Sequence, residues 1–170
     1  DVCSSDLIEG LETELELQCI ELAINEWMAE KRPGNLFVNL RANALCALVQ
    51  LEGGAGLRQA IQGGNLGRSA LVIEITEHER VEDMEALHDA VAWLRQHHAE
   101  IALDDFGDGR SSLRLWAELK PAYVKIDKYF IKGIARHPDK VQTVKALKRI
   151  AEIFGSTIVA EGIEEEDELR

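Results

Sequence analysis

Five short apolar runs alternate along the chain with longer segments in which apolar residues recur every three or four positions. The runs cover residues 36–40, 71–75, 101–105, 123–127 and 157–161. Their length and their polar or glycine borders are typical of buried strands, whereas the longer segments have helical spacing. Strands that alternate with helices are normally parallel, because each helix returns the chain to the same edge of the sheet. The pattern therefore predicts a parallel α/β fold.

Three helices have the clearest signals. One should follow Pro138, with Asp139 as its cap and Gly155 at its end. A second is predicted over 83–97 and a third over 13–30. Residues 1–7 fit neither pattern, so we interpret them as a non-native or disordered leader, followed by one domain over 8–170.

Each predicted strand ends in polar or charged residues. These are Asn39, Glu74, Asp104 with Asp105, Lys125 with Asp127, and Glu161. The carboxyl ends of parallel strands lie at one edge of a sheet or barrel, so these side chains are expected to form one site. Two adjacent carboxylates repel each other unless a cation lies near them, and Mg²⁺ and similar ions prefer oxygen ligands. The segment around Asp104 taken alone is also compatible with solvated acids at a strand end.

Composition and charge exclude several classes of protein. The net charge is −12, from 31 acidic and 19 basic residues, which disfavours binding to DNA or RNA backbones. A phosphate substrate remains compatible with this charge if metal ions make the site locally positive. Three cysteines without a CxxC spacing argue against disulfides and zinc thiolate sites. Neither a membrane segment nor a signal peptide is visible, so we expect a cytoplasmic location.

Five motifs lie in order at residues 37–40, 73–77, 104–113, 124–127 and 159–164, and include Phe-Val-Asn-Leu, Asp-Asp-Phe-Gly and Val-Lys-Ile-Asp. Together they resemble a known family, the EAL domains, which are phosphodiesterases of the bacterial second messenger cyclic di-GMP. The resemblance implies a TIM-type (β/α)8 barrel that is incomplete here, with about five parallel strand-helix units.

The resemblance also implies a function: metal-dependent hydrolysis of cyclic di-GMP to linear pGpG by a two-metal mechanism. The implied ligands of two Mg²⁺ or Mn²⁺ ions are Asn39, Glu74, Asp104, Asp105 and Glu161. Lys125 would orient the attacking water or neutralise the phosphate, which makes Lys125, Glu161, Asp104 and Asp105 the catalytic set. The alternative for Lys125 is a structural ion pair with Asp127 or a neighbouring acid.

Other positions carry less specific expectations. Glu77 resembles the family residue that stabilises the loop after the aspartate pair. Asp127 and Glu164 would support the ligands or contact substrate, and Glu164 could equally be a solvated loop acid. Arg41 and Arg110 replace the usual Ser and Tyr, so each either binds a substrate phosphate or belongs to the surface.

The Glu-Ala-Leu motif and the family's last strand are not found in the chain, so we expect impaired activity of this polypeptide. The alternative function is a catalytically inactive EAL-like domain that binds cyclic di-GMP or a protein partner as a receptor or regulatory module. A different metal-dependent barrel hydrolase is a third interpretation. The resemblance further implies a homodimer and attached GGDEF or sensory domains as partners.

Overall fold

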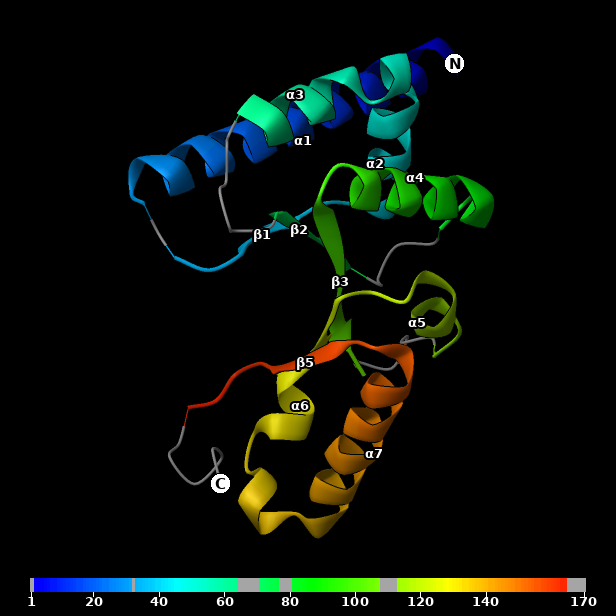
Figure 1. Ribbon diagram of the computed structural model, residues 1–170. Coiled ribbons are helices and arrows are strands. Elements are labelled where there is room, and N and C mark those ends of the chain that lie inside the picture. Colours follow the sequence, from blue (N-terminus) through cyan, green and yellow to red (C-terminus); the bar gives the residue numbers. More distant parts are fainter. Residues whose placement is uncertain (1, 32, 64–70, 77–80, 108–112, 165–170) are drawn as a thin grey trace. The chain divides into compact units, whose positions relative to one another are not determined.

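The computed structural model describes residues 2–31, 33–63, 71–76, 81–107 and 113–164, with side chains from residue 10 onward (Figure 1). Strands and helices alternate along the chain. The strands are β1 (Leu36–Asn39), β2 (Leu71–Thr76), β3 (Ala99–Phe106), β4 (Tyr123–Ile126) and β5 (Thr157–Ala160). The α-helices are α1 (Val2–Ala29), α2 (Ala42–Gln50), α3 (Ala55–Gly63), α4 (Met84–Gln96), α5 (Leu113–Leu119), α6 (Lys128–Ile131) and α7 (Pro138–Phe154). Two 3₁₀ helices, η1 (Leu51–Gly53) and η2 (Ile134–Arg136), complete the described elements.

The strands form one sheet in the order β1-β2-β3-β4-β5. β1 pairs in parallel with β2, and β4 pairs in parallel with both β3 and β5. Sequential parallel strands with helical crossovers are the repeating unit of a (β/α)8 barrel. The predicted incomplete barrel with five strand-helix units is therefore confirmed.

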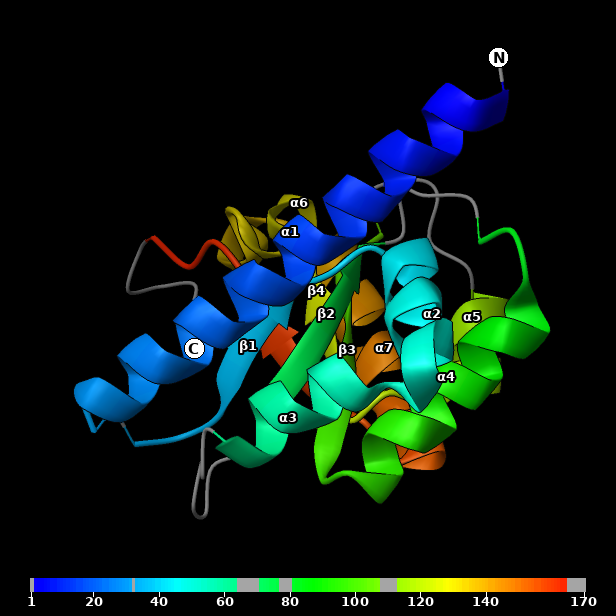
Figure 2. The ribbon, with the colours of Figure 1, turned by 90° about the horizontal axis from the view of Figure 1, so that it is seen from above.

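The chain divides into two compact units. Unit 1 consists of Asp1–Glu74 and Glu79–Glu100, and unit 2 of Ile75–His78 and Ile101–Arg170. In unit 1, α1 packs on β1, α2 and α3, and α2 packs on α4. In Figure 2 the long α1, in blue, runs past the shorter α3. The side chains that fill this core are completely or almost completely buried: Ile20, Ile24, Leu45, Leu57, Leu87 and Leu94.

Unit 2 is organised around Trp116 of α5, which is completely buried. Its ring meets Phe106 and Phe154 edge-on, at centroid distances of 5.0 and 5.9 Å. Its indole N–H donates to Ser156 Oγ at 2.9 Å, and this hydroxyl in turn donates to the carbonyl of Pro121 at 2.7 Å. The polar edge of the tryptophan is thus satisfied inside the core, which links α5 with β3 and α7.

The helix predictions held with two differences. Asp83 caps α4 by accepting from the N–H groups of Glu85 and Ala86, as the predicted start required. For α7, the prediction that Asp139 is the cap is wrong: His137 holds that position and Pro138 is the first helical residue. Proline suits the first turn because its missing N–H would have no partner there. Gly155 ends α7 at φ 76°, as predicted.

The first helix begins at Val2, which is earlier than the predicted residue 13. The division into a leader over 1–7 and a domain over 8–170 stays a prediction. Within the part of the chain that the structure describes, none of the helices combines the length and the apolar content needed to cross a membrane.

Candidate metal centre

The aspartate pair lies at an irregularity in β3. Leu103 pairs with Val124 and Phe106 with Ile126, so Asp104 and Asp105 together oppose one residue of β4, Lys125. In a regular strand, successive side chains point to opposite faces. One extra residue forms a β-bulge, which changes the direction of the side chains beside it. Asp105 has φ 52°, a left-handed conformation that Asp tolerates better than most residues.

The bulge brings three carboxylates together. One oxygen each from Asp104, Asp105 and Glu161 lies within 4.8 Å of the others. Asp104 is 8% exposed, and its Oδ1 accepts a hydrogen bond of 3.0 Å from the N–H of Asp105. Glu161 follows β5 directly. Three acids from two strands thus meet where β3 and β5 end.

Lys125 lies among these acids. Its Nζ is 2.8 Å from Asp104 Oδ1 and 2.8 Å from Glu161 Oε1. The expected alternative of an ion pair with a neighbouring acid therefore exists, with Asp104 and Glu161 as the partners. One ammonium among three carboxylates leaves a formal charge of −2, which favours a further cation.

The donor set fits the metals that the sequence predicted. Hard carboxylate oxygens from different strands are typical ligands of Mg²⁺ and Mn²⁺. The short distances among Asp104, Asp105 and Glu161 are compatible with shared coordination of an ion. These residues could therefore hold a divalent metal.

Asn39 and Glu74 form a second pair, in unit 1. Asn39 ends β1 and its register partner Glu74 lies within β2, so their side chains extend on the same side of the sheet. The N–H of Leu40 donates to the carbonyl of Glu74 at 2.9 Å and continues the pairing by one residue. Glu74 is 5% exposed, whereas Asn39 is exposed. The structure therefore brings together two of the predicted ligands here and the other three, with Lys125, in unit 2.

Asp127 and Glu164 have local partners. Asp127 caps α6, with its carboxylate accepting from the N–H of Tyr129 at 2.8 Å. Glu164 is largely exposed, and its Oε2 lies 3.6 Å from Nζ of Lys132. Their geometry is that of loop and helix-cap acids, while a role towards substrate stays a prediction.

Arg41 is engaged inside unit 1. It pairs with Glu16 at 2.6 Å and with Glu12 at 2.8 Å, and these two carboxylates raise the pKa of its guanidinium above the ordinary value. Arg41 thus joins the start of α2 to α1, which gives it a structural role. Glu77 and Arg110 lie outside the residues that the structure describes, so their expected roles stay predictions.

Two residues beside the cluster, Gly107 and Phe130, were not among the predicted site residues. Gly107, directly after β3, has φ 108°, and a Cβ built there would lie 2.3 Å from Cε2 of Phe130. The ring of Phe130 therefore packs on the backbone that follows the aspartate pair. The Phe-Gly step after the two acids was visible in the sequence, but its partner on α6 was not.

A family model described as "EAL domain" matches residues 4–170 of this chain. The chain belongs to the EAL domain family. Among its relatives, the cyclic di-GMP phosphodiesterase TpdA of Vibrio parahaemolyticus is 34% identical over 57% of the chain and 17% of TpdA. The cyclic di-GMP phosphodiesterase PA2567 of Pseudomonas aeruginosa is 29% identical over 84% of the chain and 24% of that protein. The chain thus spans about a quarter or less of the curated relatives it matches.

Solved EAL structures have the same fold. The EAL domain of Mycobacterium smegmatis DcpA is 27% identical with a TM-score of 0.76, covering 87% of this chain and 67% of that domain. Klebsiella pneumoniae BlrP1, solved with cyclic di-GMP and calcium, is 27% identical with a TM-score of 0.76, over 92% of this chain and 40% of BlrP1. A second BlrP1 structure contains manganese with cyclic di-GMP. This EAL chain therefore resembles domains that bind the dinucleotide together with divalent metals.

Proposed function

We propose that this EAL chain contributes the central part of a metal-dependent phosphodiesterase that hydrolyses cyclic di-GMP to linear pGpG. The observation that carries the proposal is the cluster of Asp104, Asp105 and Glu161 around Lys125. Relatives named cyclic di-GMP phosphodiesterases and solved relatives with the bound dinucleotide support the substrate.

Five residues of the chain would hold two Mg²⁺ or Mn²⁺ ions. In unit 2 these ligands are Asp104, Asp105 and Glu161, and in unit 1 they are Asn39 and Glu74. When bound, two such ions lower the pKa of a water and stabilise the entering and leaving oxygens of an in-line displacement. Supplying ligands from separate strands fixes their spacing, since strand ends are among the more rigid positions in such a fold.

Lys125 would act on charge and orientation. Two ion pairs of 2.8 Å hold its ammonium beside the carboxylates, so the side chain is already ordered in the conformation that the reaction would need. A cation in this place can neutralise a phosphate oxygen as negative charge develops, or hold the attacking water by a hydrogen bond. The proposal also includes a cytoplasmic location, a homodimer and attached GGDEF or sensory domains in the whole protein.

The test measures metal binding and hydrolysis separately, in the whole protein that contains this chain, because the chain by itself is expected to have impaired activity. Mn²⁺ binding is followed by titration calorimetry, and conversion of cyclic di-GMP to pGpG by chromatography with Mg²⁺ or Mn²⁺. Glu161→Gln keeps the size of the side chain but removes its charge, and should weaken Mn²⁺ binding and lower turnover by about 10²-fold or more. Glu152→Gln, on the exposed side of α7, is the matched control and should leave both unchanged.

Two outcomes would contradict the proposal. Hydrolysis that persists in Glu161→Gln or in a chelator would refute the two-metal mechanism. Binding of cyclic di-GMP without turnover, in a protein that binds Mn²⁺ normally, would favour the receptor or regulatory function instead.

A further inference from the structure

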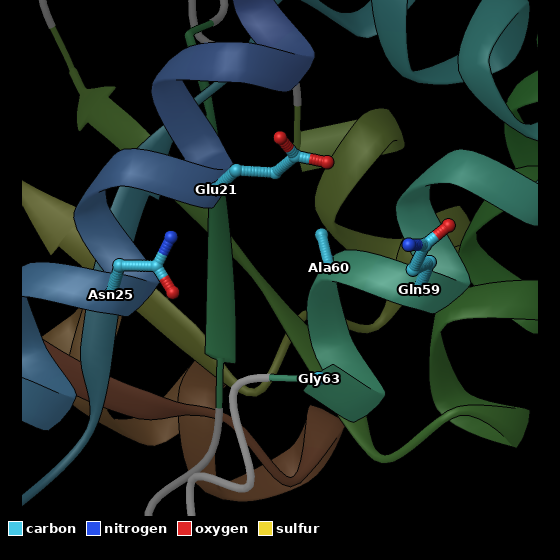
Figure 3. A pocket seen from close by; sticks show the side chains of 5 residues that line it. All are labelled: Glu21, Asn25, Gln59, Ala60 and Gly63. Carbon is cyan, nitrogen blue, oxygen red and sulfur yellow. The ribbon is translucent and has the colours of Figure 1, made fainter.

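The polar hollow of unit 1 and helix α6 of unit 2 differ in their relation to the metal ligands. The hollow has a volume of about 280 Å³ and lies between α1 and α3, with Glu21, Asn25 and Gln59 in its lining (Figure 3). None of the predicted ligands belongs to its described lining. Helix α6 instead contacts the residues that follow both acid-bearing strands of unit 2, β3 and β5. Its contacts can therefore set where those acids lie.

The ring of Phe130 packs on the turn after the aspartate pair. A Cβ at Gly107 would overlap this ring, so the ring lies directly against the backbone two residues beyond Asp105. That backbone has positive φ values, of 52° at Asp105 and 108° at Gly107. Strained backbone conformations persist where the surrounding packing fixes them. Phe130 is half-buried and supplies part of that packing.

The first residue of α6, Lys128, packs on the loop that follows β5. Gly162 comes directly after Glu161, and a Cβ at this glycine would lie 2.7 Å from Cβ of Lys128. The N–H of Glu161 donates to the carbonyl of Ile126 at 3.3 Å, which joins the same loop to the end of β4. Helix α6 thus contacts both the backbone after Asp105 and the backbone after Glu161.

Helix α6 has only four residues and is held at both ends. At its start, the carboxylate of Asp127 accepts from the N–H of Tyr129 at 2.8 Å, and the N–H of Asp127 donates to the carbonyl of Phe106 at 3.2 Å. At its end, Nζ of Lys140 from α7 donates to the carbonyls of Tyr129 and Lys132. The last turn of an isolated helix leaves such carbonyls without a partner. A single helical turn is unstable by itself, so the position of α6 depends on these contacts.

We infer that α6 positions the metal ligands of unit 2, with Phe130 as the positioning residue for the aspartate pair and Lys140 as the residue that fixes α6. The ring limits how far the backbone after Asp105 can move, which keeps its carboxylate beside those of Asp104 and Glu161. Metal ions require ligand oxygens at well-defined distances, and removal of a residue that orients a ligand typically lowers affinity by about 10- to 100-fold. The inference rests on the proposed function, since it takes this cluster to be a metal centre.

The test compares Mn²⁺ binding, by titration calorimetry, among variants of the whole protein that contains this chain. Phe130→Ala removes the ring and should raise the Kd for Mn²⁺ by at least about tenfold. Phe130→Leu keeps an apolar side chain on Gly107 and should stay within about threefold of the unchanged protein. Lys140→Met keeps the length of the side chain without its hydrogen bonds to α6, and should raise the Kd about two- to fivefold.

Trp93→Ala is the matched control for Phe130→Ala, because Trp93 of unit 1 is also a half-buried ring that packs on a glycine. A Cβ at Gly54 would overlap this ring. Trp93→Ala should lower the melting temperature and leave the Kd for Mn²⁺ unchanged. Lys145→Met, on the exposed side of α7, is the control for Lys140→Met. With saturating Mn²⁺, Phe130→Ala should lower kcat for cyclic di-GMP by about tenfold or more and change KM by less than about threefold, because the ring acts on the ligands and not on the substrate.

An unchanged Kd in Phe130→Ala would overturn the inference, and so would an equal rise in Trp93→Ala or a rise in Phe130→Leu as large as in Phe130→Ala. Glu161→Gln distinguishes this failure from that of the proposed function. If Glu161→Gln raises the Kd and Phe130→Ala does not, the metal centre stands and the positioning role is refuted; if neither raises it, both are refuted. Thermal melts establish that each variant is folded, and if Phe130→Ala is not, Lys140→Met against Lys145→Met decides by the same criterion.

Discussion

Replacing Lys125 with methionine separates its structural and catalytic contributions. The variant keeps an unbranched side chain of similar length but removes the ammonium that lies 2.8 Å from both Asp104 and Glu161. Two carboxylates then lose their shared cation beside a third, Asp105. We expect the protein to be less stable without added metal, and hydrolysis to be lost even when metal is present.

The magnitude follows from burial. The side chains of Lys125, Asp104 and Glu161 are only 16%, 11% and 29% exposed, so solvent screens their ion pairs weakly. Breaking a buried pair on one side costs about 3 kcal/mol or more. For a domain of this size, that corresponds to a melting temperature lower by roughly 6–12 °C. Mn²⁺ at about 100 times its Kd returns about 2.7 kcal/mol, since it binds only the folded state.

The assay is a thermal melt of both proteins with and without Mn²⁺. The unchanged chain should show the smaller increase with Mn²⁺, because the ion competes with Lys125 for the same oxygens. Lys145→Met is the matched control, since Lys145 lies on the exposed side of α7. The reasoning is refuted if Lys125→Met melts at the same temperature as this control, or if Mn²⁺ stabilises the Lys125→Met and unchanged proteins equally.

Three further predictions concern single residues. Asp105→Asn should change the free energy of unfolding by less than about 0.5 kcal/mol, because Asn tolerates φ 52°, while Asp105→Val should lower it by about 1–2 kcal/mol. Both variants should weaken Mn²⁺ binding. Equal urea midpoints of the two variants would contradict the role of the backbone conformation. Gly107→Ala should lower the free energy of unfolding, measured by urea denaturation, by at least about 2 kcal/mol, because of the φ of 108° and the contact with Phe130. If the same substitution costs as much free energy in a Phe130→Ala background, the ring is not the cause. Burial, with a smaller effect of Asp83, raises the pKa of the Cys46 thiol. Iodoacetamide should therefore label Cys46 far more slowly than the exposed Cys19, as mapped by mass spectrometry. Because the pKa of this thiol is higher in the folded than in the unfolded state, its contribution to the free energy of unfolding should decline above about pH 8.5.

The sequence by itself determined the strands, their parallel direction and the residue types at their ends. Apolar runs of five residues and helical spacing between them depend on local patterns, so β1 to β5 were predicted within two residues of their observed bounds at every end. The end of α7 was also local, since glycine at position 155 adopts its positive φ without a Cβ penalty. The start of α7 was not determined by a single local signal, because both Asp139 and Pro138 are typical of helix starts, and proline occupies the first helical position.

Only the tertiary structure decided how the acids are arranged. Alternation along a regular strand would have pointed Asp104 and Asp105 to opposite faces, and the bulge against β4 with φ 52° at Asp105 brings their carboxylates together. The partners of Lys125 likewise depend on β3, β4 and β5 lying side by side, which no local pattern specifies. The ion pairs of Arg41 also depend on tertiary structure, because α1 places Glu12 and Glu16 beside it although they are more than twenty residues away in the sequence. Local spacing thus set which ligands the chain offers, and long-range packing set which of them meet, because side-chain direction and strand neighbours are properties of the folded sheet.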